Sequence, residues 1–201
     1  MGLFLDAAKA WNALCETTYT IEVGRKNQQY TIDLSFEAAD FPHLAGMQYA
    51  KDVDFKLRPA EYYGKNLIPA IVSGKLDETL ICKATKWDKR IKGRLSAIIH
   101  IQQALEQSFV LAQFNPNRVK GSCDIDAKYV LKDNNSGITF FIFLDERSGR
   151  FYCKSAFQKS FLDYTENQAI MTVLQVTKTT AEGASVLYKH PNYRAKELVD
   201  A

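Results

Sequence analysis

The sequence predicts an α+β fold in which N-terminal helices and a hairpin precede an antiparallel β-sheet with a long helix packed on it. Three observations carry this prediction: helical spacing of apolar residues at the start, a second and longer helical stretch over 86–107, and strand-rich segments after residue 108. The 201 residues suffice for one core, so we expect a single domain over 1–201. Within it, 1–35 forms the first helix and hairpin, 36–180 the core and 181–201 a tail.

The first 35 residues change their periodicity once. Apolar residues in "LFLDAAKAWNALCE" recur at i, i+3 and i+4 spacing, which is typical of an amphipathic helix. In "TTYTIEVGRKNQQYTIDLSF" apolar and polar residues alternate on both sides of "GRKNQ", which predicts a β-hairpin. From residue 37 to 75, prolines separate short helical pieces and turns.

The remaining chain supplies the long helix and the sheet. The stretch "KWDKRIKGRLSAIIHIQQALEQS" carries apolar residues along one side, so we expect it to cover the sheet. Segments such as "ITFFIFL", "RFYCKSAF" and "AIMTVLQVTKT" are rich in β-branched and aromatic residues, and the turn-rich linkers "KDNNSG" and "DERSG" join antiparallel neighbours. The sheet is therefore expected mainly over residues 109–178.

Composition excludes several classes of protein. No apolar stretch approaches the roughly 18 residues of a membrane helix, and the first residues lack the pattern of a secretory signal, so we expect a cytoplasmic protein without a membrane partner. The net charge of +3 permits an anionic partner but does not by itself indicate one. There is no glycine-rich nucleotide loop, no metal-binding cluster of histidines and no pair of cysteines at ligand spacing, and we expect no cofactor and no metal.

Polar groups lie near the ends of several predicted elements, and their mixture suits one reaction. Cleavage of RNA without a metal requires a base for the 2′-hydroxyl, cations for the phosphorane and a proton donor for the leaving oxygen. A histidine titrates near neutrality and can be that base. The candidates are His43, Lys51, Arg147, Arg150, Lys154, Ser155, Lys159, Tyr164 and Lys178.

Four segments resemble a known family. "DFPHLAGMQYAKD", "IPAIVSGKL", "KRIKGRLSAIIHI" and "CKSAFQKSFLDY…MTVLQVTK" are similar, in order and spacing, to phage-associated members of the barnase/EndoU/colicin/RelE-like nuclease superfamily. The resemblance spans most of 36–180, and "FPHLAGMQ" is its most specific piece. It implies a metal-independent endoribonuclease or toxin-like RNase of phage or mobile-element origin. RNA, such as tRNA or another structured RNA, would be its partner, and a protein inhibitor or phage protein would be a further one.

The resemblance places His43 on the family histidine, as the general base, and Lys154 and Ser155 in a strand that contributes polar groups to the active site. Tyr164 completes the catalytic candidates, while Lys51, Arg147, Arg150, Lys159 and Lys178 are expected to bind substrate. Only this histidine matches a motif, so a mechanism with two histidines would need His100 or His190, and otherwise a lysine or tyrosine would be the acid.

Two structural alternatives stay open at this point. His43 could be a packing residue at the end of a helix, and the lysines of "KSAFQKSF" could protect the edge of a strand against aggregation. The basic stretch 83–94 could likewise be only a solvated helix face. In that case the protein would be a catalytically inactive phage-related module that holds a protein or a nucleic acid.

Overall fold

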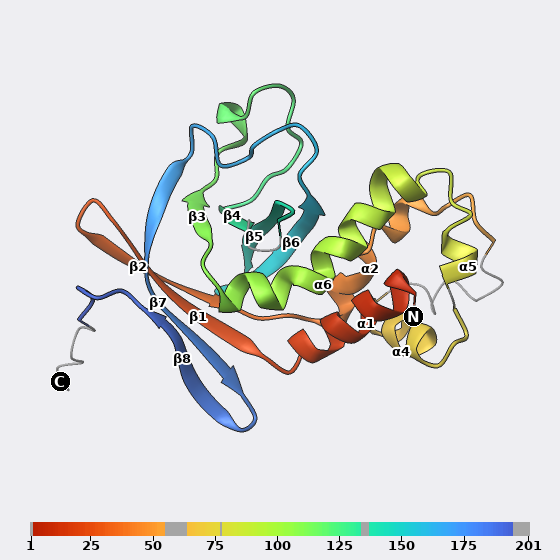
Figure 1. Cartoon of the computed structure of the whole chain (residues 1–201), viewed down its shortest axis with the longest axis horizontal. Coiled ribbons are helices and arrows are strands. Elements are labelled where there is room, and N and C mark those ends of the chain that lie inside the picture. Colours follow the sequence, from red (N-terminus) through yellow and green to blue (C-terminus); the bar gives the residue numbers. More distant parts are fainter. Residues whose placement is uncertain (1, 55–63, 77, 134–136, 195–201) are drawn as a thin grey trace.

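In the computed structural model, helices gather at one end of the molecule and a strongly curved sheet fills the other (Figure 1). The structure describes residues 2–54, 64–76, 78–133 and 137–194. The α-helices are α1 (Leu3–Leu14), α2 (Phe41–Leu44), α4 (Leu67–Val72), α5 (Glu78–Ile81) and α6 (Lys92–Glu106), and a π-helical turn, η4 (Trp87–Ile91), leads into α6. Short 3-10 turns are η1 (Ala38–Asp40), η2 (Met47–Tyr49), η3 (Gly64–Asn66) and η5 (Pro116–Arg118).

Eight strands form one sheet. They are β1 (Thr18–Arg25), β2 (Gln28–Leu34), β3 (Val110–Gln113), β4 (Tyr129–Asp133), β5 (Phe140–Arg147), β6 (Arg150–Gln158), β7 (Ala169–Thr180) and β8 (Gly183–Lys189). Their order is β1-β2-β6-β5-β4-β3-β7-β8, and β1 also pairs with β7, so that seven strands close into a ring and β8 is attached outside it. The pairing of β2 with β6 is parallel, and the other pairs are antiparallel.

The expected fold class, an antiparallel sheet with a long helix packed on it, is therefore wrong: the sheet is closed and mixed. The N-terminal hairpin causes this difference, because it enters the sheet between β7 and β6. The register of β1 on β7 runs from Thr18↔Thr179 to Gly24↔Thr172, while β2 meets β6 at Leu34↔Phe151. An open sheet would leave unpaired backbone groups along both of its edges, and the hairpin pairs with both.

Local sequence explains the elements that close the ring. In α1, Phe4, Ala7, Trp11 and Leu14 are buried along one face, and the Trp11 indole donates to the carbonyl of Glu37 at 2.9 Å. The hairpin turns through two residues with positive φ, Lys26 and Asn27, as the right-handed twist of its strands requires. Tyr19, Ile21 and Val23 alternate with more exposed residues and face the core.

Strand β5 is buried on both faces, which explains its continuous apolar run. Phe140, Ile142 and Leu144 belong to the main core, which also receives the buried faces of α1 and α6. Phe141 and Phe143 point to the opposite face and join a second cluster, which the segments after β3 and β6 cover with Phe114, Val119, Leu162 and Tyr164. The sheet therefore has a helix-covered face and a second face that is partly covered by loops.

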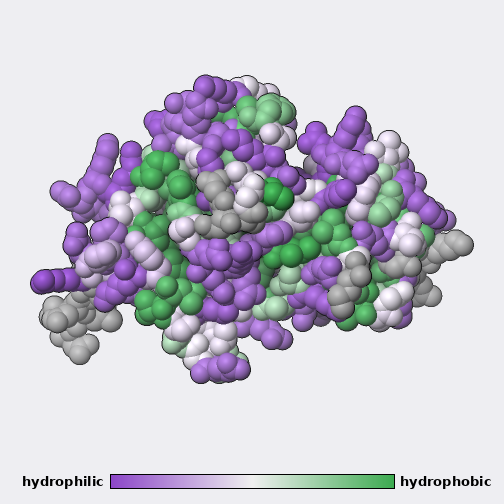
Figure 2. All heavy atoms as spheres, viewed as in Figure 1, coloured by the Kyte–Doolittle hydropathy of each residue, from purple (hydrophilic) through white to green (hydrophobic). Residues whose placement is uncertain are grey.

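The surface is mostly hydrophilic in the view of Figure 2, with hydrophobic residues visible over part of the sheet and over part of the helical end. Every residue of β8 is exposed, including Val186, Leu187 and Tyr188. Within the described ranges, no helix has both the length and the apolar character needed to cross a membrane. The single-domain organisation stays a prediction.

Closure of the ring can be tested with a disulfide. Because Thr20 lies opposite Thr177 in the β1–β7 register, oxidation of a Thr20→Cys/Thr177→Cys variant should join the two strands, as detected by peptide mapping with mass spectrometry. The matched control pairs Thr20→Cys with Thr172→Cys, which lies opposite Gly24 instead and should not link. Equal linkage in the two variants, or none in the first, would contradict the closed arrangement.

Candidate active site

A β-bulge in β6 places two consecutive polar residues on the same face of the sheet. Ser155 lies opposite Phe143 and Cys153 lies opposite Leu144, so Lys154 is an extra residue without a partner in the register. Cys153 and Ala156 both belong to the main core. Lys154 and Ser155, which lie between them, consequently point away from that core, whereas strict alternation would separate them.

The bulge lies beside a seam in the ring. Strands β2 and β6 share a single register pair, Leu34↔Phe151, and one further bond from the Ser35 amide to the Phe151 carbonyl. Beyond this point α2 and α6 contact β6 in place of a strand. The first turn of α6 and the short helix α2 can therefore bring side chains to the bulge.

Arg94 is the side chain that α6 contributes. Its Nη1 donates to the Ser155 hydroxyl at 3.3 Å, and its guanidinium lies 5.6 Å from the ring centroid of Tyr49 and 5.8 Å from that of Phe157. Burial lowers the pKa of Arg94, but an arginine stays charged at neutral pH. Within the described residues it forms no ion pair with a carboxylate.

A second arginine lies next to Arg94. The Arg90 guanidinium is 5.8 Å from the ring centroid of Tyr49, so the two cations share one aromatic ring. Arg90 is exposed, and it likewise has no carboxylate partner in the described part of the chain. The result is a local excess of positive charge, as expected where a phosphate binds.

His43 lies on α2 and is exposed. Partial burial of its ring and the charges of Arg94 and Lys154 lower its pKa, and Asp40 opposes them. At neutral pH the imidazole is therefore mostly unprotonated and can accept a proton. Asp40 precedes His43 by three residues, and its Oδ2 is buried without a hydrogen-bond partner in the described structure.

Lys154 forms an ion pair with Asp145 at 2.6 Å. Partial burial alone would lower the pKa of Lys154, but this carboxylate outweighs it, and the net shift is upward. Tyr164 packs against Phe141, Phe143 and Phe157 with centroid distances of 5.2–5.4 Å. Burial raises the pKa of Tyr164, and the nearby Arg90 partly offsets that shift.

The five residues expected to bind substrate are scattered. Arg147 donates to Asp40 at 2.9 Å and lies over the Tyr152 ring, so it holds the segment that leads into α2. Lys159 pairs with Asp163 at 3.5 Å. Lys178 pairs with Glu106, the last residue of α6, at the end of the helix away from Arg94. Lys51 and Arg150 are exposed, and neither forms an ion pair in the described structure.

The other two histidines lie elsewhere. His100 stacks on Phe140 with a centroid distance of 4.7 Å, and its Nδ1 is 2.7 Å from the carbonyl oxygen of Ser96. His190 follows β8, where its Nδ1 accepts from the Asn192 amide. Neither contributes to the group around His43. In the ranges that the structure describes, no three His, Cys, Asp or Glu residues are grouped as a metal site would require.

A comparison with protein families decides the relationship that the motifs suggested. The model of the family described as "phage-Barnase-EndoU-ColicinE5/D-RelE like nuclease4" matches residues 3–190. The chain belongs to this nuclease family. Searches among curated proteins and solved structures found no match. Membership confirms the resemblance and makes the chain a nuclease of this type, with nucleic acid as the expected partner.

Sequence reasoning about this nuclease missed Arg90, Arg94 and Tyr49. The available signal was the basic stretch 83–94, which resembles an ordinary solvated face because all of its charged side chains except Arg94 are indeed exposed. Only the three-dimensional arrangement shows that Arg94 turns toward the bulge. This nuclease thus presents His43, Arg94, Lys154 and Ser155 around one surface, with Tyr164 nearby.

The electrostatic coupling in this group is open to measurement by NMR titration of the His43 ring. Replacing Arg94 with Gln should raise the pKa of His43, because a neighbouring positive charge is removed. Asp40→Asn should have the opposite effect and lower the pKa of His43 below its value in the parent protein. Lys9→Gln removes an exposed charge from α1 and should leave that pKa unchanged. If Arg94→Gln left the pKa of His43 where it is in the parent, the two side chains would not be neighbours.

Proposed function

We propose that this nuclease cleaves RNA by attack of the 2′-hydroxyl on the adjacent phosphate, at the face of β6 that carries the bulge. The observation that supports this proposal most strongly is Arg94, a half-buried cation that has no carboxylate partner and lies beside an unprotonated histidine. A buried positive charge without a counter-ion is costly, and a phosphate supplies both the charge and the acceptor oxygens.

The roles follow from the chemistry of each side chain. His43 accepts the proton of the 2′-hydroxyl, and Asp40 stabilises the imidazolium that forms. Arg94 binds the non-bridging oxygens, and Ser155, which already accepts a hydrogen bond from Arg94, holds the guanidinium in place. Lys154 adds a second cation to stabilise the developing negative charge.

The leaving 5′-oxygen needs a proton in the same reaction. Tyr164 is the donor that we propose, because its hydroxyl is protonated at neutral pH, whereas the ion pair with Asp145 makes Lys154 hold its own proton more tightly. The P–O bond to the 5′-oxygen breaks as the bond to the 2′-oxygen forms. The products are a 2′,3′-cyclic phosphate and a 5′-hydroxyl end, and none of the steps proposed here requires a metal ion.

The purified protein should cleave single-stranded RNA in EDTA and leave cyclic phosphate ends. His43→Ala should lower the rate by about 10²–10⁴-fold, the usual contribution of a general base. His190→Ala is the matched control, because this histidine lies after β8 and away from the group, and should cleave at the parental rate. Cleavage at an equal rate in His43→Ala would place the activity at another site. A folded parent that binds RNA without cutting it would favour the inactive binding module.

The acidic side of the pH–rate profile should report the titration of His43. A base acts only when unprotonated, so kcat/KM should rise with pH and level off above the pKa of His43, which lies below the ordinary value of about 6.5. In Asp40→Asn the plateau should extend to lower pH, because the carboxylate that favours the imidazolium is gone. A profile of Asp40→Asn that moves to higher pH would rule out this arrangement.

A further inference from the structure

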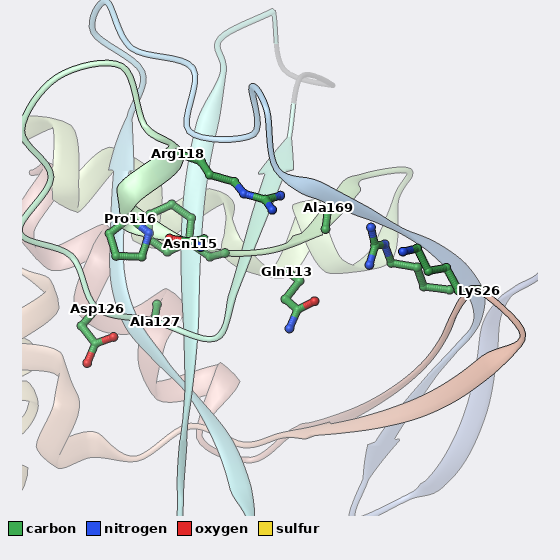
Figure 3. A pocket seen from close by; sticks show the side chains of 10 residues that line it. Lys26, Gln113, Asn115, Pro116, Arg118, Asp126, Ala127 and Ala169 are labelled. Atoms are coloured by element: carbon green, nitrogen blue, oxygen red, sulfur yellow. The ribbon is translucent and has the colours of Figure 1, made fainter.

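A cavity of about 420 Å³ lies away from the bulge, where the β1–β2 turn approaches the segment that follows β3. Gln113, Asn115 and Arg118 line it from one side, and Arg25 and Lys26 line it from the other. Figure 3 shows the side chains of Arg118 and Lys26 extending into it from opposite sides. None of these residues belongs to the group around His43.

The charges of this cavity are unbalanced. Arg25, Lys26 and Arg118 face a single lining carboxylate, Asp126. None of the three cations forms an ion pair within the described part of the chain. Three converging cations with amide donors beside them are the surroundings that a phosphate group prefers.

A smaller cavity of about 80 Å³ continues from the first. It shares Arg25, Lys26 and Gln113 with the larger one and adds two tyrosines, Tyr30 and Tyr129. Tyr30 is 41% exposed, and its hydroxyl donates to the Gln28 side chain, which also lines this cavity. An exposed aromatic ring beside amide groups can stack a base and bond its edge.

The backbone of the turn gives an independent reason to examine Lys26. Its φ of 49° lies in the left-handed region, where a residue with a β-carbon is strained and where glycine or asparagine is the usual choice in such turns. A lysine at this position weakens the turn. Strain of this kind is often retained where a side chain has a function.

We propose that the two cavities together bind one nucleotide of the RNA strand at a distance from the cleaved bond, with its phosphate between Arg118 and Lys26 and its base on Tyr30. This inference rests on RNA being the substrate of the proposed function. The two regions share one face of the sheet: Phe114 and Ala127 line the larger cavity and belong to the same apolar cluster as Tyr164, which lies near the bulge. One strand can thus follow the surface from the bulge to the cavity.

The test measures binding of a fluorescein-labelled, single-stranded 12-nucleotide RNA to the His43→Ala protein by anisotropy between 50 and 200 mM salt. Adding Lys26→Gly should weaken binding about threefold or more and reduce the slope of log Kd against log salt by about 1. The same change should leave the urea midpoint equal or higher, because glycine relieves the left-handed strain. Lys9→Gln removes the same charge from α1 and should bind RNA like its parent.

The aromatic contact has its own pair of variants. In the same background, Tyr30→Ala should weaken binding about fivefold to 150-fold, the range for losing one stacked base, whereas Tyr30→Phe keeps the ring and should bind like the parent. Lys26→Gly and Tyr30→Ala proteins that bind like Lys9→Gln would overturn the inference.

Cleavage by the protein with His43 intact separates this inference from the proposed function. If that protein cuts RNA but the cavity variants do not weaken binding, the inference alone fails. If it cuts no RNA while the cavity variants weaken binding as expected, the proposed function fails and the nucleotide site stands. A protein that neither binds nor cuts RNA would refute both.

Discussion

Strand β2 leaves β6 after the single pair Leu34↔Phe151, and the arrangement of the candidate site depends on that early departure. Had the pairing continued, the edge of β6 would be hydrogen-bonded to a strand as far as Gln158. Instead α2 and α6 contact this edge, so that His43 and Arg94 approach a face of the sheet that helices could not otherwise reach. The bulge at Lys154 then turns two successive side chains to the same face. The candidate site therefore lies at the place where β2 and β6 close the ring through a single residue pair.

Arg94 shows why this surface suits a phosphate. A half-buried charge loses several kcal/mol of hydration, and cation–π contacts with Tyr49 and Phe157 return about 0.5–2 kcal/mol each. The bond to Ser155 involves a neutral acceptor, so no negative charge in the described structure balances the guanidinium. Lys154 and Arg147, in contrast, have Asp145 and Asp40 as partners. Arg94 thus stays incompletely compensated in the free protein, at the place where the family histidine lies.

Periodicity predicted the local elements better than their arrangement. The spacing of Phe4, Trp11 and Leu14 and the alternation of Tyr19, Ile21 and Val23 define a helix and a strand, because each depends only on neighbours in the chain. The pairing of β1 with β7 joins residues more than 140 positions apart, and alternation does not encode it. The bulge was equally hidden, since two adjacent polar residues, Lys154 and Ser155, do not by themselves show which face of a strand each one takes. His43 was found through its motif, while Arg94 was indistinguishable from its solvated neighbours. The roles of these residues, RNA as the substrate and a protein inhibitor stay predictions.

The central claim is that Arg94 binds the phosphate that is attacked, and a crystal structure with an uncleavable ligand tests it most directly. The ligand is a short RNA with a 2′-O-methyl group at the cleavage position, which removes the nucleophile but keeps the phosphate. The account predicts a non-bridging oxygen within hydrogen-bond distance of the Arg94 guanidinium, about 2.7–3.2 Å, with the 2′-oxygen beside the His43 ring. An RNA strand that passes over β6 without any contact to the Arg94 guanidinium, while Arg94 keeps its hydrogen bond to Ser155, would contradict the account.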